Sequence, residues 1–266
     1  MAVDAERVRI DVADHVADVR MVRADKHNGL DWRMFESLNE ALDAVGGDRS
    51  VRAVVLSGEG RSFCAGLDFQ SFMSGNGNFD GFAAVEGSAA NFAQRVAYGW
   101  RELEVPVVAA VTGACFGGGL QIALGADIRF AAPDARLSVM ESRYGLVPDM
   151  SLSQTIGRLV RDDIARELTY TARVVEAPEA LELGLVTRIE DDPLAAARSL
   201  AQEIAARSPD AIRRAKRLAN EAPNLSAADG LALEAALQRE LLGTPNQVAA
   251  VGAALTKEPA EFADPG

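Results

Sequence analysis

Three short apolar runs constrain the fold of this chain more than any other feature. They are VRAVVLSG at 51–58, VVAAVTG at 107–113 and DIRFAA at 127–132. A strand that is apolar along nearly its whole length is typical of a parallel sheet that other elements cover on both faces. Helical stretches are expected near 88–103 and 118–125, between these runs. Strands that alternate with helices predict an α/β fold.

The N-terminal region predicts a hairpin followed by a helix. Apolar residues alternate in two runs on either side of a turn at ADH, a pattern typical of two antiparallel strands. The loop DKHNGLD ends at Asp31, which is suited to cap a helix because its carboxylate can accept a backbone N–H of the first turn. Apolar residues follow at helical spacing, at Met34, Leu38, Leu42 and Val45.

The sequence predicts two parts of different architecture. Strands and helices alternate to about residue 190, and from 193 onward only helical patterns follow. We therefore expect an α/β core over 1–192 and a C-terminal helical region over 193–266. The glycine- and asparagine-rich segment 71–82 is expected to be a mobile loop beside a site.

Composition limits the classes of partner. The chain has 266 residues, 48% of them hydrophobic, and a formal net charge of −12, which argues against nucleic acid or an anionic membrane as a partner. The two cysteines, Cys64 and Cys115, form no disulfide framework. The N-terminus lacks the apolar core of a signal peptide, and no apolar stretch is long enough for a membrane span. These features predict a cytoplasmic protein.

The stretch GACFGGGLQIALGADIRF at 113–130 places three consecutive glycines where a helix is expected to begin. Glycine costs a helix roughly 0.5–1 kcal/mol relative to alanine, so a compensating advantage is expected. One is that free N–H groups and the positive end of the helix dipole bind a phosphate or a developing oxyanion. The other is close packing of the helix against a strand. No Walker lysine and no spaced GxGxxG accompany the glycines, and this stretch alone leaves both explanations open.

A second stretch, GEGRSFCAGLDF at 58–69, again places a turn of small residues at the end of an apolar run. Together with CFGGGLQIALGADI, it resembles the crotonase family, the enoyl-CoA hydratase/isomerase superfamily. LSVMESRYGLVPDMSLSQTIGRLV at 137–160 and ELTYTARVVEAPEALELGLVTRI at 167–189 resemble the same family. The four motifs follow the family's order and spacing, and the resemblance covers nearly the whole chain.

The resemblance implies a fold, a ligand and an oligomer. The expected fold is a crotonase-like spiral of ββα units with a C-terminal helical trimerisation region, so a homotrimer or hexamer is expected. The expected ligand is an acyl-CoA thioester, with coenzyme A as part of the substrate and no separate cofactor. The backbone N–H groups of Leu67 and Gly118 match the family's oxyanion hole, which binds the thioester oxygen and stabilises an enolate. No His, Cys and carboxylate residues have the spacing of a metal site.

Three residues match acid–base positions of the family. Hydratases of the family carry one glutamate just after the glycines and a second further along, and here these positions hold Gln121 and Glu141. A glutamine amide forms hydrogen bonds but takes up no proton, so the two-glutamate mechanism of hydration is not available unchanged. Asp149 matches an aspartate of the dienoyl-CoA isomerase branch, which uses it with the glutamate to move protons. We therefore expect Glu141 and Asp149 to shuttle a proton along the acyl chain.

The resemblance also predicts contacts to coenzyme A. Arg61 matches a basic position before the first oxyanion motif, and a cation there suits a phosphate. Lys26, Ala65 and Asp68 are expected in the same site. Lys257, near the C-terminus, is a candidate to reach the coenzyme A of a neighbouring subunit.

Three alternatives to an isomerase stay open. One is an enoyl-CoA hydratase that uses Glu141, with Gln121 orienting the water. Another is a protein that binds acyl-CoA without turning it over, which a glutamine at this position favours. The third is hydrolysis or decarboxylation of a branched acyl-CoA, because proteins of one fold can host different chemistries. A thiol nucleophile is not expected, since neither Cys64 nor Cys115 has a histidine close in sequence.

Overall fold

The computed structural model describes residues 6–74 and 80–265. The strands are β1 (Val8–Ala13), β2 (Val16–Met21), β3 (Ala53–Gly58), β4 (Val107–Val111), β5 (Ala114–Phe116), β6 (Ile128–Ala131), β7 (Arg136–Ser138), β8 (Val175–Glu176) and β9 (Arg188–Ile189). The α-helices are α1 (Trp32–Gly47), α2 (Phe69–Ser74), α3 (Phe92–Glu102), α4 (Gly118–Gly125), α5 (Leu152–Thr155), α6 (Asp162–Thr171), α7 (Ala177–Leu183), α8 (Pro193–Ala205), α9 (Pro209–Glu221), α10 (Ala227–Leu241) and α11 (Pro245–Thr256). Short 3₁₀ helices are η1 (Ala24–Lys26), η2 (Glu141–Tyr144), η3 (Ile156–Arg158) and η4 (Ala222–Asn224).

The larger sheet has six strands in the order β1-β2-β3-β4-β6-β9. β1 and β2 pair antiparallel, with Ala13 opposite Val16 at the turn, which confirms the predicted hairpin. The other neighbouring strands of this sheet run parallel. The three apolar runs form β3, β4 and β6, which lie beside one another within the sheet, so the predicted α/β architecture is confirmed.

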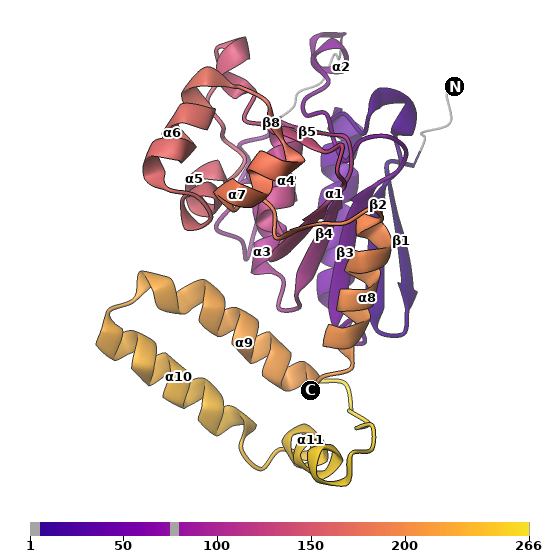
Figure 1. Cartoon of the computed structure of the whole chain (residues 1–266), viewed down its shortest axis with the longest axis vertical. Helices are drawn as coiled ribbons and strands as arrows, with labels where there is room; N and C mark the ends of the chain where they lie inside the picture. Colours follow the sequence, from indigo (N-terminus) through magenta and orange to yellow (C-terminus); the bar gives the residue numbers. More distant parts are fainter. Residues whose placement is uncertain (1–5, 75–79, 266) are drawn as a thin grey trace.

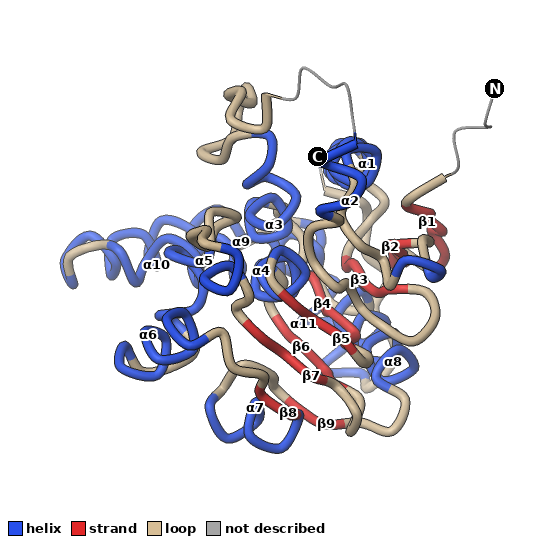
Figure 2. Tube along the Cα trace, turned by 90° about the horizontal axis from the view of Figure 1, so that it is seen from above, coloured by secondary structure: helices blue, strands red, loops and turns tan. Residues whose placement is uncertain are grey.

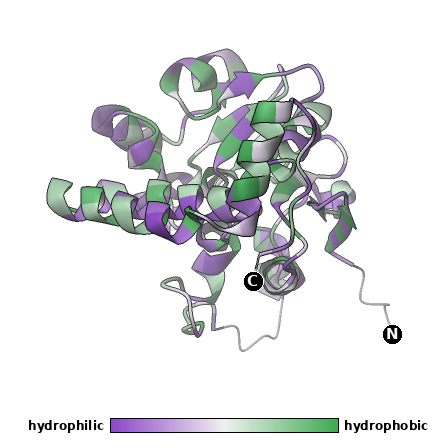
Figure 3. Cartoon of the chain, turned by 90° about the horizontal axis from the view of Figure 1, so that it is seen from below, coloured by the Kyte–Doolittle hydropathy of each residue, from purple (hydrophilic) through white to green (hydrophobic). Residues whose placement is uncertain are grey.

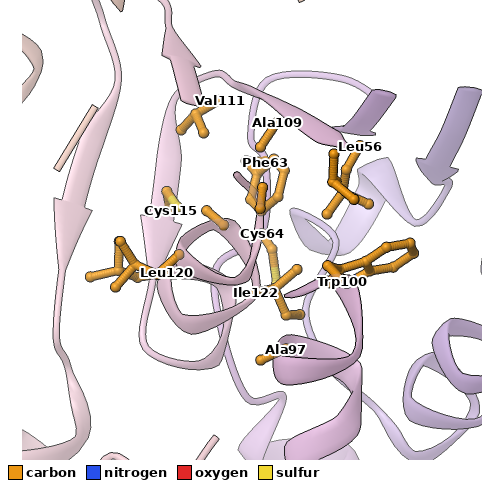
Figure 4. Packing of buried hydrophobic residues seen from close by; sticks show 14 of the residues in the cluster. Leu56, Phe63, Cys64, Ala97, Trp100, Ala109, Val111, Cys115, Leu120 and Ile122 are labelled. Carbon is orange, nitrogen blue, oxygen red and sulfur yellow. The ribbon is translucent and has the colours of Figure 1, made fainter. Parts of the chain in front are cut away.

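Helices cover both faces of the larger sheet, which explains why its central strands are apolar throughout (Figure 2). Successive residues of β3 and β4 alternate between two clusters of buried side chains. Leu56 lies in the cluster that α1, α3 and α4 complete, and Val55 lies in the cluster that α8 completes. In the first cluster, Leu56, Trp100 and Ile122 lie between the sheet and two helices (Figure 4).

Helix α1 begins where the sequence predicts. The Asp31 carboxylate accepts the Met34 N–H at 2.9 Å and so caps the helix. The four apolar residues expected on its inner face are all buried. Helices α3 and α4 lie within the two stretches predicted as helical, and α3 begins with a capping box in which Asn91 and Gln94 bond each other's backbone N–H groups.

The smaller sheet, in the order β5-β7-β8, brings the two glycine-bearing segments together. An isolated parallel bridge pairs Cys64 with Cys115 of β5, and the Phe116 N–H donates to the Cys64 carbonyl at 3.0 Å. A second bridge pairs Leu67 with Leu30, just before α1. β5 and β7 are three residues long, so they contain too few positions to show a periodic pattern in the sequence.

The structure corrects part of the loop predicted at 71–82. Ser71 and the residues up to Ser74 belong to α2, while 75–79 lie outside the described residues. The helix begins here because the Asp68 carboxylate accepts the Ser71 backbone N–H at 3.1 Å and its hydroxyl at 2.7 Å. An acidic residue that binds the N–H groups of a first turn is a helix-starting signal, and the glycines that follow it mask that signal in the sequence.

The C-terminal region is helical, as predicted. Its first helix, α8, packs on the larger sheet through Ala197, Ala201 and Ala205. Helices α9 to α11 extend away from the sheets, at the end of the molecule opposite to α2 (Figure 1). Helix α8 is therefore part of the core, although it follows the predicted domain boundary between residues 192 and 193. That boundary stays a prediction.

Buried polar contacts fix α9 to the core. Lys216 donates to the carbonyls of Trp100 at 2.9 Å and Val105 at 2.8 Å, and its ammonium pairs with Asp127 at 2.9 Å. Burial lowers the pKa of Lys216, against the effect of Asp127. These contacts hold the helical region in a defined position relative to α3 and β4.

Among the described residues, no helix combines the length and the hydropathy that crossing a bilayer requires. A cytoplasmic location stays a prediction.

Candidate active site

A cavity of about 200 Å³ lies where the two glycine-bearing segments meet. Residues 65–67 and 116–118 line it, together with Met140, Glu141 and the loop up to Asp149. A larger cleft, of about 720 Å³, lies between α3 and α9 and is lined mainly by charged side chains. Many of these are ion-paired, as in Arg214–Glu240 at 3.0 Å, and its described lining includes none of the predicted site residues. The smaller cavity is therefore the candidate active site.

Backbone crowding explains two of the glycines. A Cβ atom on Gly119 would lie 2.2 Å from the Cys64 carbonyl oxygen. A Cβ atom on Gly66, whose φ is +88°, would lie 2.7 Å from the Phe116 carbonyl oxygen. Only glycine allows the two segments to approach this closely. Close packing, one of the two explanations left open by the sequence, therefore accounts for both glycines.

Leu67 and Gly118, whose N–H groups match the oxyanion hole of the family, line the cavity. Gly118 is the first residue of α4, so its N–H has no acceptor within the helix. The neighbouring N–H groups of Asp68 and Gly117 donate to Leu30 and Ser138. By contrast, neither the Leu67 nor the Gly118 N–H donates a hydrogen bond to any of the residues that the structure describes. Two open donors on one cavity are what an oxyanion hole requires.

Gln121 is enclosed and fully engaged in hydrogen bonds. Its exposed fraction is 1%. Its Oε1 atom accepts the backbone N–H groups of Met150 at 2.9 Å and Leu152 at 3.1 Å. Its Nε2 atom donates to Glu141 Oε1 at 2.7 Å. Because two backbone donors hold Oε1, the orientation of the amide is fixed and Nε2 faces Glu141.

Glu141 has the properties of a base. Its side chain is buried, and its Oε2 atom has no hydrogen-bond partner among the described residues. Burial raises the pKa of Glu141, and the negative charge of Asp149 raises it further, while the hydrogen bond from Gln121 opposes both. A carboxyl group whose pKa is raised, on a residue that lines a cavity, is suited to remove a proton from a bound molecule.

Asp149 lines the same cavity but is exposed to solvent. The next residue, Met150, donates its N–H to Gln121. Gln121 therefore holds both predicted carboxyl groups, Glu141 through a direct hydrogen bond and Asp149 through the backbone of its loop.

The model of the family described as enoyl-CoA hydratase/isomerase matches residues 11–264. The chain belongs to the enoyl-CoA hydratase/isomerase family. Its crotonase-like fold is also that of solved structures, such as an enoyl-CoA hydratase from Bacillus anthracis, with a TM-score of 0.87, 27% identity and coverage of 97% of this chain and 99% of that one. The chain is therefore an acyl-CoA enzyme of this family.

Similar proteins carry names from both branches of the family. A probable enoyl-CoA hydratase of Rhizobium meliloti (strain 1021) is 32% identical over 97% of this chain and 98% of its own length. The mitochondrial Delta(3,5)-Delta(2,4)-dienoyl-CoA isomerase of Homo sapiens is also 32% identical, over 93% of this chain and 79% of its own length. The likeness shows the family and does not separate hydration from isomerisation.

Of the residues predicted to bind coenzyme A, only Ala65 is among the described lining residues of the cavity, and Lys26, Arg61 and Asp68 are not. Lys26 and Arg61 are exposed, and Ala65 lines the cavity while its N–H donates to the His27 carbonyl at 2.9 Å. The exposed cations are free to meet phosphates in this family of acyl-CoA enzymes. Their contacts with coenzyme A stay predictions.

Asp68 has a structural task. Its carboxylate pairs with Arg23 at 2.9 Å and accepts two hydrogen bonds from Ser71. Burial alone would raise the pKa of Asp68, but the bonds from Ser71 and Arg23 outweigh it and lower the pKa to about 2. Asp68 thus joins α2 to the loop before α1, and a direct contact with coenzyme A stays a prediction.

The sequence did not single out four apolar residues that border the cavity, which we call the rim: Phe69, Tyr144, Leu146 and Val147. Their exposed fractions are 36%, 57%, 49% and 74%. The rings of Phe69 and Tyr144 lie 4.5 Å apart between centroids. Three of the four lie in the motif that contains Glu141, and large apolar residues in a polar loop were the signal that could have found them.

The two cysteines, Cys64 and Cys115, are not among the described lining residues of the cavity. Both are buried and free, and burial raises the pKa of the Cys64 thiol to about 12. A thiol is the weakly nucleophilic form. Among the described residues, no three His, Cys, Asp or Glu side chains gather as a set of metal ligands.

Proposed function

We propose that this enzyme moves a double bond along the acyl chain of an enoyl- or dienoyl-CoA thioester. The observation that carries the proposal is the bonding of Gln121. Its amide cannot take up a proton, and its oxygen already accepts two backbone N–H groups. Position 121 therefore offers no second base to activate a water, whereas Asp149 offers a second carboxyl group on the same cavity.

The reaction begins at the thioester oxygen, which accepts hydrogen bonds from Leu67 and Gly118 near the positive end of α4. Glu141 removes a proton from the carbon next to the carbonyl, and the electron pair of that C–H bond moves into the conjugated enolate. Asp149 passes a proton to the far carbon of the conjugated system, and the double bonds shift. Because Asp149 is exposed, solvent replaces that proton, and the proton that Glu141 removed is released to solvent after the product leaves.

Gln121 is a positioning residue in this mechanism. Its hydrogen bond at 2.7 Å holds the Oε1 atom of Glu141, while Oε2 has no hydrogen-bond partner among the described residues. It stabilises the ionised form of Glu141 without adding a charge.

Hydration by Glu141 alone is the second candidate. The observation in its favour is that Glu141 lines the cavity while its Oε2 atom has no hydrogen-bond partner among the described residues. In that mechanism Glu141 both takes the proton of the water and returns one to the acyl chain, and Asp149 has no chemical task.

Ultraviolet absorbance separates the two candidates. The purified protein is given a 3,5-dienoyl-CoA and, in the same buffer, crotonyl-CoA. Isomerisation produces a 2,4-dienoyl thioester, whose absorbance lies at longer wavelength, and we expect this rise to depend on both Glu141 and Asp149. Loss of the enoyl band of crotonyl-CoA, unaffected by Asp149→Asn, would instead establish the hydratase. Binding of both thioesters with no change in either would favour a non-catalytic acyl-CoA protein or a different acyl substrate.

We also propose that the enzyme is a homotrimer or a hexamer. Large apolar residues of α10, α11 and the turn between them are exposed: Leu231, Leu242, Val248, Val251 and Leu255. Figure 3, coloured by hydropathy, shows hydrophobic residues along the helix that projects furthest from the molecule. An exposed apolar surface of this kind favours subunit contact. Light scattering after size-exclusion chromatography gives the mass, and a monomer would contradict the proposal.

A further inference from the structure

We propose that Arg23 is a positioning residue of the oxyanion hole, because its guanidinium fixes the segment that carries Leu67 against the segment that precedes α1. The inference rests on the proposed function in one respect, namely that the Leu67 N–H binds the thioester oxygen. It adds a residue outside the cavity on which that donor depends, since Arg23 is not among the described lining residues.

The guanidinium of Arg23 joins two segments that are distant in the chain. Its Nη2 atom pairs with Asp68 at 2.9 Å and with Asp31 at 3.3 Å, and its Nη1 atom donates to the Gly29 carbonyl at 2.8 Å. The side chain of Arg23 is only 10% exposed. Hydrogen bonds between ionised groups are stronger than those between neutral groups, so the guanidinium holds Asp68 and the residues before α1 in one arrangement.

Leu67 lies between the backbone bonds that join these two segments. The Leu30 N–H donates to the Gly66 carbonyl at 2.8 Å, and the Asp68 N–H donates to the Leu30 carbonyl at 2.9 Å. These two bonds form the parallel bridge between Leu30 and Leu67, in which the N–H group of Leu67 itself takes no part. The position of that N–H group therefore follows from Gly66 and Asp68, the residues on either side of it.

The two carboxylates that Arg23 contacts are themselves fixed at the starts of helices. Asp31 accepts the Met34 N–H at the start of α1, and Asp68 accepts the Ser71 N–H at the start of α2. Burial raises the pKa of Asp68 less than the bonds from Ser71 and Arg23 lower it, to about 2. The pair of Arg23 and Asp68 therefore stays charged at neutral pH, and it sets how the start of α2 and the neighbouring Leu67 lie relative to α1.

Arg23→Lys tests this arrangement while it keeps the positive charge. A lysine lacks the planar fork of a guanidinium, so it cannot hold the Gly29 carbonyl and both carboxylates in the same geometry. A small displacement of a catalytic group costs up to about 10²-fold in rate, and the loss of a whole oxyanion donor costs about 10²–10³-fold. We expect kcat to fall by about 10- to 100-fold, with a much smaller change in KM, because the oxyanion hole acts mainly on the transition state.

Arg52→Lys is the matched control. Arg52 is another largely buried arginine, and its Nη2 atom donates to the Phe262 carbonyl and pairs with Asp264, both at 2.9 Å. It is not among the described lining residues of the cavity. Both variants should lose stability in urea denaturation, but only Arg23→Lys should lose kcat. Asp68→Asn removes the charge that Arg23 binds and should lower kcat in the same way, which tests the inference through a second variant.

Infrared spectroscopy observes the oxyanion hole without turnover. Butyryl-CoA that carries an isotope label at the thioester carbonyl is bound to each protein, and the frequency of its carbonyl stretch is measured by difference spectroscopy. Hydrogen bonds to the oxygen weaken the C=O bond, so we expect a lower frequency on the wild type and on Arg52→Lys than in water. On Arg23→Lys and Asp68→Asn the frequency should return toward its value in water.

An unchanged carbonyl frequency in Arg23→Lys and Asp68→Asn would overturn the inference even if kcat fell, because the loss would then be one of stability. An equal loss of kcat in Arg52→Lys would also overturn it. If the frequency on the wild type equals that in water, the proposed oxyanion hole fails, and the inference fails with it. If the wild type lowers the frequency and Arg23→Lys lowers it equally, the proposed function stands and only the role of Arg23 is wrong.

Discussion

The two sides of the active-site cavity are built in opposite ways. The floor, which we define as residues 64–67 and 116–119 together with Glu141, is held by backbone contacts so close that a Cβ atom on Gly119 would lie 2.2 Å from a carbonyl oxygen. The rim consists of side chains that project into solvent, and Val147 is 74% exposed. At Gly66 and Gly119 the floor leaves no room for a side chain, whereas the rim is defined by its side chains alone.

This difference separates chemistry from specificity. The proposed oxyanion donors are backbone N–H groups, so a change of side chain would alter them only by moving the chain itself. The rim can change residue by residue with little cost in stability, because exposed positions tolerate substitution. A family that varies its substrates on one fold can do so at such a rim. The predictions below test how far the contrast holds.

The largest expected effect is on the floor. Gly119→Ala should lower the free energy of unfolding by about 3 kcal/mol, because the new methyl group meets the Cys64 carbonyl oxygen, and overpacking of a core site typically costs about 1–3 kcal/mol. Urea denaturation of the variant measures the loss. Soluble, active Gly119→Ala with an unchanged midpoint would show that the floor is not crowded.

A glycine outside the floor provides the matched control. Gly252 lies within α11, and a Cβ atom there would meet no neighbouring atom of the described residues within 4 Å. Gly252→Ala should therefore raise the free energy of unfolding, by up to about 1 kcal/mol, because alanine favours a helix. Replacement of glycine by alanine should therefore lower the free energy of unfolding at position 119 and raise it at position 252.

The next largest effect compares a floor carboxylate with one in the loop beside the rim. Glu141→Gln should lower kcat for the dienoyl substrate by about 10²–10⁴-fold, the contribution of a positioned base. Asp149→Asn should act in the same direction but less, because Asp149 is exposed and water can deliver the proton in its place. The dienoyl absorbance assay measures both. A larger loss in Asp149→Asn than in Glu141→Gln would reverse the roles.

The sequence predicts the parts of this site that depend on local pattern. The cap at Asp31, the hairpin and the start of α4 at Gly118 are all where neighbouring residues indicate them. Glu141 and Asp149 came from the resemblance to the family, and the structure places both on one cavity.

Other parts could not be predicted, because they join segments far apart in the chain. The bonds from Gln121 reach residues 29 and 31 positions away, and no local pattern announces them. The strands β8 and β9 have two residues each, so only the neighbouring strands define them. The rim forms because α2 approaches η2, which brings Phe69 to Tyr144.

A smaller effect is expected where Gln121 links the floor to the loop of Asp149. In Gln121→Glu, one carboxylate oxygen takes the place of Nε2, 2.7 Å from Glu141 Oε1. Two carboxylates at this distance share a proton, so the upper apparent pKa of the pair rises above that of Glu141 alone. The acidic limb of the kcat/KM profile should move to higher pH by roughly one unit or more.

The control for this variant is Gln121→Met, which removes the hydrogen bonds without adding a charge. It should lower stability, because two backbone N–H groups lose their acceptor, and it should shift the profile less than Gln121→Glu does. Identical profiles for the wild type and Gln121→Glu would mean that residue 121 does not contact Glu141 during catalysis.

The smallest expected effect is the cost in stability of burying Glu141. Since burial raises the pKa of Glu141 above its ordinary value of 4.5, the folded protein binds this proton more tightly than the unfolded chain. Binding of this proton therefore contributes its full stabilisation below pH 4.5, and that stabilisation is lost as pH rises through the folded-state pKa of Glu141. The glutamine in Glu141→Gln has no carboxylate to bury, so the free energy of unfolding of this variant should increase relative to that of the wild type as pH rises from below 4.5 toward neutrality.

Glu258→Gln is the control, because it makes the same change of charge at an exposed glutamate, and it should not show this relative increase. Urea denaturation at several pH values measures this difference. If the free energies of unfolding of Glu141→Gln and the wild type changed with pH in parallel, burial in the floor would not disfavour the carboxylate, and floor and rim would differ in packing alone.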